Sequence, residues 1–331
     1  MRIRPLGLVA ITVALVGVAI AAVAFGPANL AKLGSPPGTK TPQTPQTPQA
    51  TSINTPTWHV GDSWTYNVNS TPPDVFVTGP TWGSPSLTGA LTRTVVSADN
   101  SEYNVTMQGS FHLGSVFDAA RDAGETNSST LMLFRPVMEN ATVDGYALYR
   151  ASDLAELKEV RTVHLKSSLW TDRGWFNTSY TATVETTYEP ALDIWAFPIA
   201  ENETWNVSSN ATIHAMIEWR FDGPNESFGF KHMFNATAPI RLMLHSGELE
   251  KVTTPAGMFS SIPVRVALPT IDRLATDDRE GPVVGLGGDE CGRPRLAAEA
   301  WFSGDVGNVV RAVNFFGGMK IVAELASFHR A

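Results

Sequence analysis

The sequence predicts a mostly β protein, a curved or sandwich-like antiparallel sheet that lies outside the cell behind one N-terminal transmembrane helix. Three observations predict it. Short runs of alternating apolar and polar residues fill most of residues 57–331, an uncharged apolar stretch lies near the N-terminus, and Asn-x-Ser/Thr sequons recur along the chain. A period of two residues is typical of strands with one buried face.

The composition is that of a globular protein of low charge. The chain has 331 residues, 43% of them hydrophobic and 17% charged, with a formal net charge of −8. Nucleic-acid binding requires a basic patch, and none is present, so we expect no nucleic-acid partner. The single cysteine, Cys291, excludes an intrachain disulfide. It is either a partly shielded loop thiol or the site of a disulfide between chains.

Residues 1–31 are predicted to form a membrane anchor. The run Leu6–Phe25 carries no charge, and a helix of this length crosses a hydrocarbon core of about 30 Å. Arg2 and Arg4 precede it, which predicts a cytoplasmic N-terminus and an extracellular C-terminal domain. A cleaved signal peptide is the alternative, because Ala22-Val23-Ala24 fits the cleavage pattern. Either way we expect export, and with a retained anchor a single-pass protein of the cell membrane.

Residues 32–56 are predicted to form a spacer. They are rich in Pro, Thr and Gln, and the triplet Thr41-Pro42-Gln43 occurs three times in succession. Proline fixes φ and removes a hydrogen-bond donor, so the segment favours extended polyproline II over a packed core. It is either a stiff, O-glycosylated stalk or a flexible linker.

Residues 57–331 are predicted to form the β-rich extracellular domain. A weak echo between Val60–Val68 and Ala200–Val207 indicates either two similar halves, 57–190 and 191–331, or two similar strand entries in one sheet. Two short helices are expected, Val116–Ala123 and Asp153–Glu159. The chain from Asn308 to Phe328 is predicted to be a hairpin. The other expected strands are Trp64–Asn69, Leu91–Ser97, Tyr103–Phe111, Val160–Leu169, Trp175–Tyr188, Trp205–Phe221, Phe228–Ala236, Arg241–Leu249 and Val264–Leu268.

Ten of the 16 asparagines lie in N-glycosylation sequons, well above chance. In Trp205–Phe221 the odd positions are apolar, whereas the sequon residues Asn206 and Asn210 are even. Both are therefore predicted on the solvent face. No sequon follows Asn235, so we expect the glycan-free C-terminal region to contact a partner or the membrane. The ten predicted sites are Asn69, Asn104, Asn127, Asn140, Asn177, Asn202, Asn206, Asn210, Asn225 and Asn235.

No catalytic or nucleotide-binding motif is present, and the seven histidines lack the spacing of metal ligands. The loop 272–298 concentrates carboxylates that suit Ca²⁺, but they do not fit the EF-hand spacing, and a solvated hairpin insertion is the alternative. No other cofactor is expected. Among nine tryptophans, Trp175 and Trp82 are the candidates for ligand contact, because Trp175 is out of phase with the apolar face of its strand and Trp82 lies in a loop of Gly, Pro and Ser. The Ca²⁺ candidates are Asp277, Asp278, Glu280, Asp289 and Glu290.

Three patches carry a family resemblance: Val60–Tyr66, Thr254–Phe259 and Trp301–Val310. In this order they resemble uncharacterised archaeal and bacterial secreted proteins related to the LolA/LppX-like β-clam group. The resemblance implies a curved antiparallel sheet over a groove that holds lipid or another apolar ligand. It supplies no catalytic residues. The chain departs from the many lipoproteins of that group, because no cysteine follows its hydrophobic segment.

These observations predict a non-enzymatic glycoprotein that binds an apolar or glycan ligand, a lipid, or a partner protein of the cell surface. A passive structural or adhesive surface component is the second interpretation. An extracellular hydrolase is the third, and no constellation of residues supports it.

Overall fold

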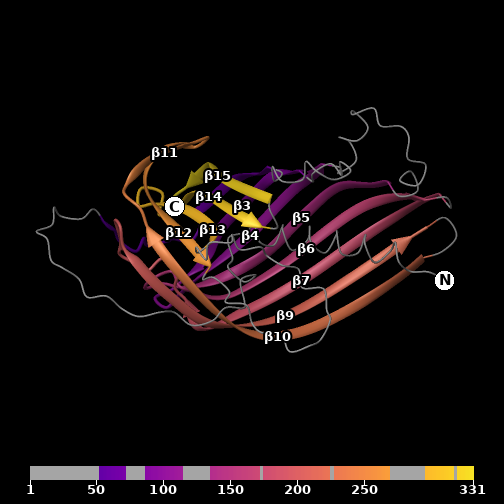
Figure 1. Ribbon diagram of the computed structural model, residues 1–331, viewed down its shortest axis with the longest axis horizontal. Helices are drawn as coiled ribbons and strands as arrows, with labels where there is room; N and C mark the ends of the chain where they lie inside the picture. The colour runs from indigo at the N-terminus through magenta and orange to yellow at the C-terminus, as the bar shows by residue number, and fades with distance from the viewer. Residues whose placement is uncertain are drawn as a thin grey trace, which may run out of the picture.

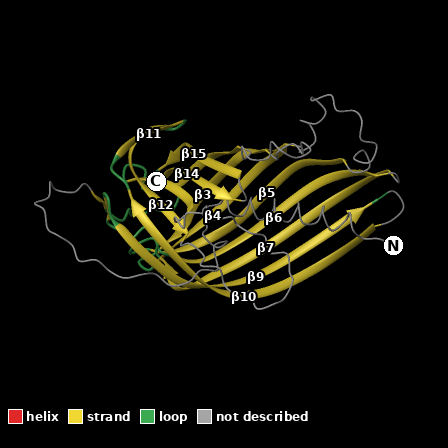
Figure 2. Ribbon diagram, viewed as in Figure 1, coloured by secondary structure: helices red, strands yellow, loops and turns green. Residues whose placement is uncertain are grey.

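The structure is a computed structural model that describes residues 52–71, 86–114, 135–171, 174–223, 227–268, 295–316 and 319–331. All regular structure in these ranges is β, and every paired strand is antiparallel (Figure 2). None of these residues forms a helix long and apolar enough to cross a membrane. The predicted anchor and the helix Val116–Ala123 lie outside the described residues.

Fifteen strands occur in the described ranges. The first eight are β1 (Ser52–Ile53), β2 (Ser63–Thr71), β3 (Ser86–Ala98), β4 (Glu102–Gly114), β5 (Arg135–Arg150), β6 (Glu156–Thr171), β7 (Gly174–Leu192) and β8 (Ile199–Ala200). The remaining seven are β9 (Thr204–Asp222), β10 (Ser227–Ser246), β11 (Glu250–Thr254), β12 (Gly257–Leu268), β13 (Arg295–Ser303), β14 (Asn308–Phe316) and β15 (Met319–His329).

Thirteen strands form one sheet in the order β10-β9-β7-β6-β5-β4-β3-β2-β15-β14-β13-β12-β11, and β1 pairs separately with β8. The sheet closes on itself because β10 also pairs with β12. Twelve strands therefore make a closed, barrel-like ring, and β11 adds to β12 as a hairpin. The mostly β, antiparallel prediction is confirmed, and closure of the sheet is a further finding.

Among the described residues the closure is partial, because the two closing strands differ in length. β10 has 20 residues and β12 has 12. They pair only from Met243 to Ser246, whereas β9 accompanies β10 from Ser227 to His245. Within the described residues, Ser227–Leu242 thus has a strand on one side only, and we call this segment the overhang. Figure 1 shows β9 and β10 running well past the crossing with β12.

Several strand predictions are correct, and others need correction. Phe228–Ala236 and Arg241–Leu249, predicted as two strands, belong to one strand that ends at Ser246. The sequence analysis did not predict the short strands β1 and β8, nor β5, β11 and β13. The helix Asp153–Glu159 is wrong: Asp153 lies in a turn and Glu156 begins β6. The Asp153 carboxylate accepts hydrogen bonds from the Arg150 guanidinium and the Ala155 N–H, which stabilises the turn.

One face of the sheet encloses a single apolar core. In β9 the odd positions Val207, Ala211 and Trp219 are buried, and the even positions Asn206 and Asn210 are exposed, as the alternation predicts. Trp64, Tyr66 and Val68 of β2 are fully buried. Burial of apolar surface stabilises a fold by about 25 cal/mol per Å², so this face holds the ring together.

The three sequence patches meet around β15, although they are far apart in the chain. Trp64 Nε1 donates to the carbonyl of Val306 at 3.3 Å, and the Tyr66 hydroxyl donates to Val309 at 2.9 Å. The N–H of Ala256, in the patch Thr254–Phe259, donates to the carbonyl of Leu325 in β15 at 3.0 Å. The patches therefore join β2, β14, β15 and the β11–β12 hairpin, which is a structural role.

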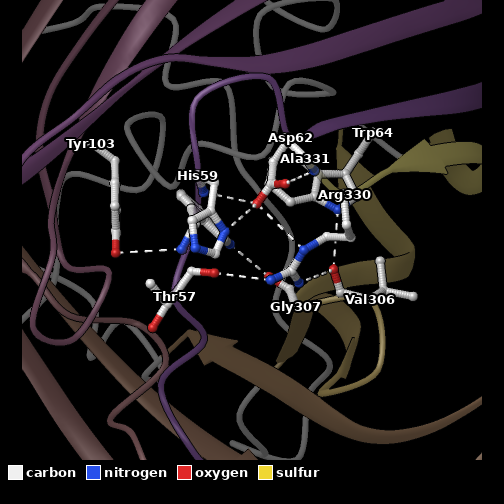
Figure 3. Close-up of polar contacts among 10 residues, drawn as sticks. Thr57, His59, Asp62, Trp64, Tyr103, Val306, Gly307, Arg330 and Ala331 are labelled. Carbon is white, nitrogen blue, oxygen red and sulfur yellow. Dashed lines mark hydrogen bonds and ion pairs between the residues drawn. The ribbon is translucent and has the colours of Figure 1, made fainter.

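Asp62 lies at the centre of this junction (Figure 3). Its side chain is fully buried and accepts hydrogen bonds from the backbone N–H groups of His59 at 2.9 Å and Ala331 at 2.7 Å. The Arg330 guanidinium lies 3.4 Å from the same carboxylate and donates to the carbonyl of Val306. Trp58 Nε1 donates to Gly307 at 2.8 Å. Buried polar groups are stable only when paired, and these are.

Each of the three patches also contains a glycine with positive φ: Gly61 at 100°, Gly257 at 140° and Gly307 at 67°. L-residues rarely adopt this region, so the turns require glycine at these positions. The shared residues of the patches are thus explained by turn geometry and by hydrogen bonds at strand entries.

Candidate functional site

The strongest candidate site is the end of the sheet at the turn between β9 and β10, where aromatic side chains continue along one face onto the overhang. Five rings form what we call the aromatic ladder: Tyr180 on β7, Trp219 and Phe221 on β9, and Phe228 and Phe230 on β10. Antiparallel register places them together, because Phe228 is paired with Phe221 and Phe230 with Trp219.

The rings contact one another in offset and edge-on geometries. Tyr180 meets Trp219 edge-on with centroids 5.4 Å apart. Trp219 stacks on Phe230 at 5.6 Å, and Phe221 stacks on Phe228 at 4.7 Å. Such pairs are each worth about 0.5–1.5 kcal/mol beyond their buried area, so the ladder is an ordered surface.

Exposure rises along the ladder toward the edge of the sheet. Trp219 and Phe221 are 7% and 5% exposed, whereas Phe228 and Phe230 are 46% and 51% exposed. Every residue from Ser227 to Thr237 is exposed; Phe234 lies on the same face of β10 as Phe228 and Phe230, whereas Met233 lies on the opposite face. Large contiguous apolar exposure is unusual for a soluble domain and marks binding surfaces.

The opposite face of the same strands is polar. A shallow, open depression of about 550 Å³ lies at this end of the sheet, and the ladder residues Trp219, Phe228 and Phe230 line it together with polar residues such as Glu218, Arg220 and Lys231. The charges in its lining are paired: Lys231 Nζ is 2.7 Å from Glu218, and Arg220 Nε is 3.0 Å from Asp222. These charged side chains satisfy each other at the surface, so the aromatic part of the lining is the stronger candidate for ligand contact.

A second feature is a group of buried ionisable side chains inside the closed ring, which we call the interior polar cluster. It comprises Arg93 on β3, Tyr149 on β5, Glu156, Glu159 and Arg161 on β6, and Tyr188 on β7. All six are at least nine-tenths buried. Arg161 forms an ion pair with Glu159, and Arg93 donates a hydrogen bond to the Tyr149 hydroxyl.

The cluster is incompletely paired around Glu156. Arg93 Nε, Glu156 Oε1 and the Tyr188 hydroxyl have no hydrogen-bond partner among the described residues. Burial, followed by repulsion from Glu159, raises the pKa of Glu156 well above the usual range. Burial also raises the pKa of Glu159, although Arg161 opposes this. Burial, together with the nearby Glu156 and Glu159, raises the pKa of Tyr188. The cluster therefore favours a protonated Glu156.

Most of the predicted site residues lie away from both features or outside the described residues. Trp82 and the whole Ca²⁺ candidate set (Asp277, Asp278, Glu280, Asp289 and Glu290) are outside. Trp175 is in β7, where its backbone pairs with Trp170 of β6 at the same end of the sheet as the aromatic ladder. No group of three potential metal ligands occurs in the described parts of the chain.

The sequon residues mostly lie on the solvent face, as predicted. Asn104 is half-buried, and its side-chain oxygen is enclosed without a hydrogen-bond partner. Asn202 lies in a turn with φ of 59°. Asn127 and Asn225 are outside the described residues. The exposed ones are Asn69, Asn140, Asn177, Asn202, Asn206, Asn210 and Asn235.

Sequence reasoning missed the interior polar cluster and the exposure of the ladder. Glu156 and Glu159 fell in the segment wrongly predicted as a helix, so no pattern placed them inside the ring. The alternation of Phe228 and Phe230 with polar residues did predict one apolar face. The exposure of this apolar face depends on the position at which β12 stops pairing with β10, and no sequence pattern indicates that position.

Comparison with known proteins returned no matching family model, curated protein or solved structure. The geometry of the aromatic ladder is therefore the basis for any functional assignment, and the resemblance to the β-clam group stays a prediction.

Proposed function

We propose that the protein is an exported, membrane-tethered and glycosylated surface protein that binds an acyl chain or similar apolar ligand on the aromatic ladder, without catalysing a reaction. The observation that carries the proposal is the ladder itself. Phe228 and Phe230 are about half exposed, and they stack on Phe221 and Trp219, which are buried. A ligand laid on this surface extends an apolar core that already exists.

Physical chemistry favours an apolar ligand over a polar one on this face. Covering apolar surface contributes about 25 cal/mol per Å², and the ladder supplies flat, ordered rings at low entropic cost. The charged side chains of β9 and β10 project from the opposite face and pair with each other. An apolar ligand on the ladder therefore desolvates none of those charges.

The sequons and the apolar N-terminal run support export and tethering. A curved sheet that holds an apolar ligand also agrees with the resemblance to the β-clam group. The six side chains of the interior polar cluster are buried, and the proposal assigns them no part in ligand binding.

Photolabelling tests the proposal on the full-length chain in detergent. A diazirine-bearing fatty acid is cross-linked to the protein, and the labelled peptides are mapped by mass spectrometry. We expect labels on β9 and β10 that an unlabelled fatty acid displaces. The double substitution Phe228→Ser, Phe230→Ser should reduce them several-fold. Met258→Ser removes an exposed apolar side chain on β12, 63% exposed against 46% and 51% for the two phenylalanines, and is the control. Labelling of β10 that neither competitor nor double substitution lowers would refute the proposal.

A further inference from the structure

Among the described residues, the overhang of β10 has a strand edge without a partner as well as an aromatic face. Between Ser227 and Leu242 the strand pairs with β9, and no other described strand pairs with it before Met243. An edge strand exposes a row of backbone N–H and C=O groups that can pair with another strand. The occupant that this chemistry suits is therefore an extended strand, not a compact ligand.

The edge lacks the usual protection against such pairing. Native edges are blunted by charges, prolines, bulges or short length. Here the overhang has 16 residues and includes only Lys231 and Arg241 as permanent charges, and Lys231 is paired with Glu218. Pro239 is its single proline, near the closed end. Met233, at the middle, is 68% exposed. With respect to the described strands, the overhang is thus open to pairing along most of its length.

We propose that the overhang of β10 pairs antiparallel with the same segment of a second copy of this chain, about a two-fold axis at Met233. An isologous contact requires a self-complementary strand, and this register provides one. Phe230 then lies opposite Ala236 of the second copy, and Phe228 lies opposite Ala238. At these two positions a large side chain faces a small one, whereas Phe234 faces His232 and Met233 faces its own copy at the axis.

The same register also separates the positive charges. Lys231 lies opposite Asn235, so the two lysines do not face each other, whereas an axis at Lys231 would place them in contact. Like charges opposite each other on neighbouring strands are destabilising. Asn235 is on the polar face, where an attached glycan projects away from the sheet. Because the overhang contains no acidic residue, no ion pair fixes another register.

The proposed dimer uses the backbone edge of the overhang, whereas the proposed function uses the aromatic side chains on its face. The two proposals can therefore be tested separately. The two-fold axis lies perpendicular to the sheet and keeps both aromatic ladders on one side. Pairing therefore leaves Phe228 and Phe230 of each copy on a continuous apolar face.

The experiment uses the full-length chain with Cys291→Ser, so that introduced cysteines are unique. In native mass spectrometry we expect twice the monomer mass, and Met233→Lys should return the protein to monomers because two lysines then meet at the axis. Met233→Leu should keep the dimer. Met233→Cys should cross-link with a short bismaleimide, and Met258→Cys, exposed on β12, should not.

A monomeric wild-type protein would overturn the inference, and so would a dimer that survives Met233→Lys or fails to cross-link at Met233→Cys. The fatty-acid photolabelling of the Met233→Lys monomer separates the two proposals. Retained labelling on β9 and β10 leaves the proposed function standing whatever the oligomeric state.

Discussion

The carboxylate of Asp62 accepts a hydrogen bond of 2.7 Å from the backbone N–H of Ala331, a residue 269 positions away. The contact ties the turn before β2 to the residues after β15, two strands that pair in the sheet. Asp62 is fully buried and also meets Arg330. Hydrogen bonds and an ion pair around Asp62 thus stabilise one end of the ring, and the aromatic ladder lies at the other end.

Asp62→Asn should destabilise the fold by about 2–4 kcal/mol, because an amide nitrogen would face N–H donors and leave Arg330 without its anion. Equilibrium unfolding in urea measures the change. Asp305→Asn, at an exposed turn residue, is the control and should leave the midpoint unchanged. Equal midpoints for Asp62→Asn and the wild type would show that the junction is not essential to closure.

The raised pKa of Glu156 predicts that stability falls as pH rises. The folded state holds this proton more tightly than the unfolded state, so proton binding by Glu156 contributes fully to the free energy of unfolding at low pH. This contribution declines once the pH passes the pKa of a glutamate in the unfolded chain, about 4.3. For one proton, the free energy of unfolding falls by at most about 1.4 kcal/mol per pH unit. The fall continues until the pH reaches the raised pKa of Glu156 in the folded state.

Glu156→Gln carries no titrating proton, so its free energy of unfolding should fall less steeply with pH than that of the wild type. Urea midpoints measured at intervals from pH 5 upward give both slopes. The residual slope of the variant reports Glu159, whose pKa is raised in the same direction. Glu248→Gln, at an exposed position, should retain the wild-type slope. Parallel slopes for the wild type and Glu156→Gln would contradict the assignment.

Strand phase could be predicted from the sequence because a half-buried sheet imposes a period of two. The apolar odd positions of β9, such as Val207 and Trp219, are buried as expected. The same rule failed for β5, where Asp144 and Gly145 interrupt the alternation. Gly145 is needed at that position, since a Cβ there would overlap the Val160 carbonyl.

Closure of the ring was beyond sequence reasoning because it depends on the relative lengths of strands far apart in the chain. β10 meets β12 through four residue pairs at Met243–Ser246, and no local pattern distinguishes these from the unpaired stretch before them. Pro239 lies between the two strands that the sequence predicts here, Phe228–Ala236 and Arg241–Leu249. At an edge, however, a proline need not donate to the ladder, so β10 continues through it.

Glycan occupancy should follow exposure at the sequons. Asn206 and Asn210 project from the outer face of β9, and we expect both to be modified in the native protein. Asn104 is half-buried with its side-chain oxygen enclosed, so it should be the least occupied described site. Glycopeptide mass spectrometry of protein from its native source measures each site. Uniform occupancy would show that modification precedes folding, and an unmodified protein would remove the main support for export.

Binding of an apolar ligand to the aromatic ladder is the central claim, and native mass spectrometry of the full-length protein released from detergent tests it most directly. We predict that the wild type carries bound molecules of acyl-chain mass, that Phe228→Ser, Phe230→Ser loses most of them, and that Met258→Ser retains them. A wild-type protein free of such adducts, or a double variant that carries them in the same amount, would contradict the account.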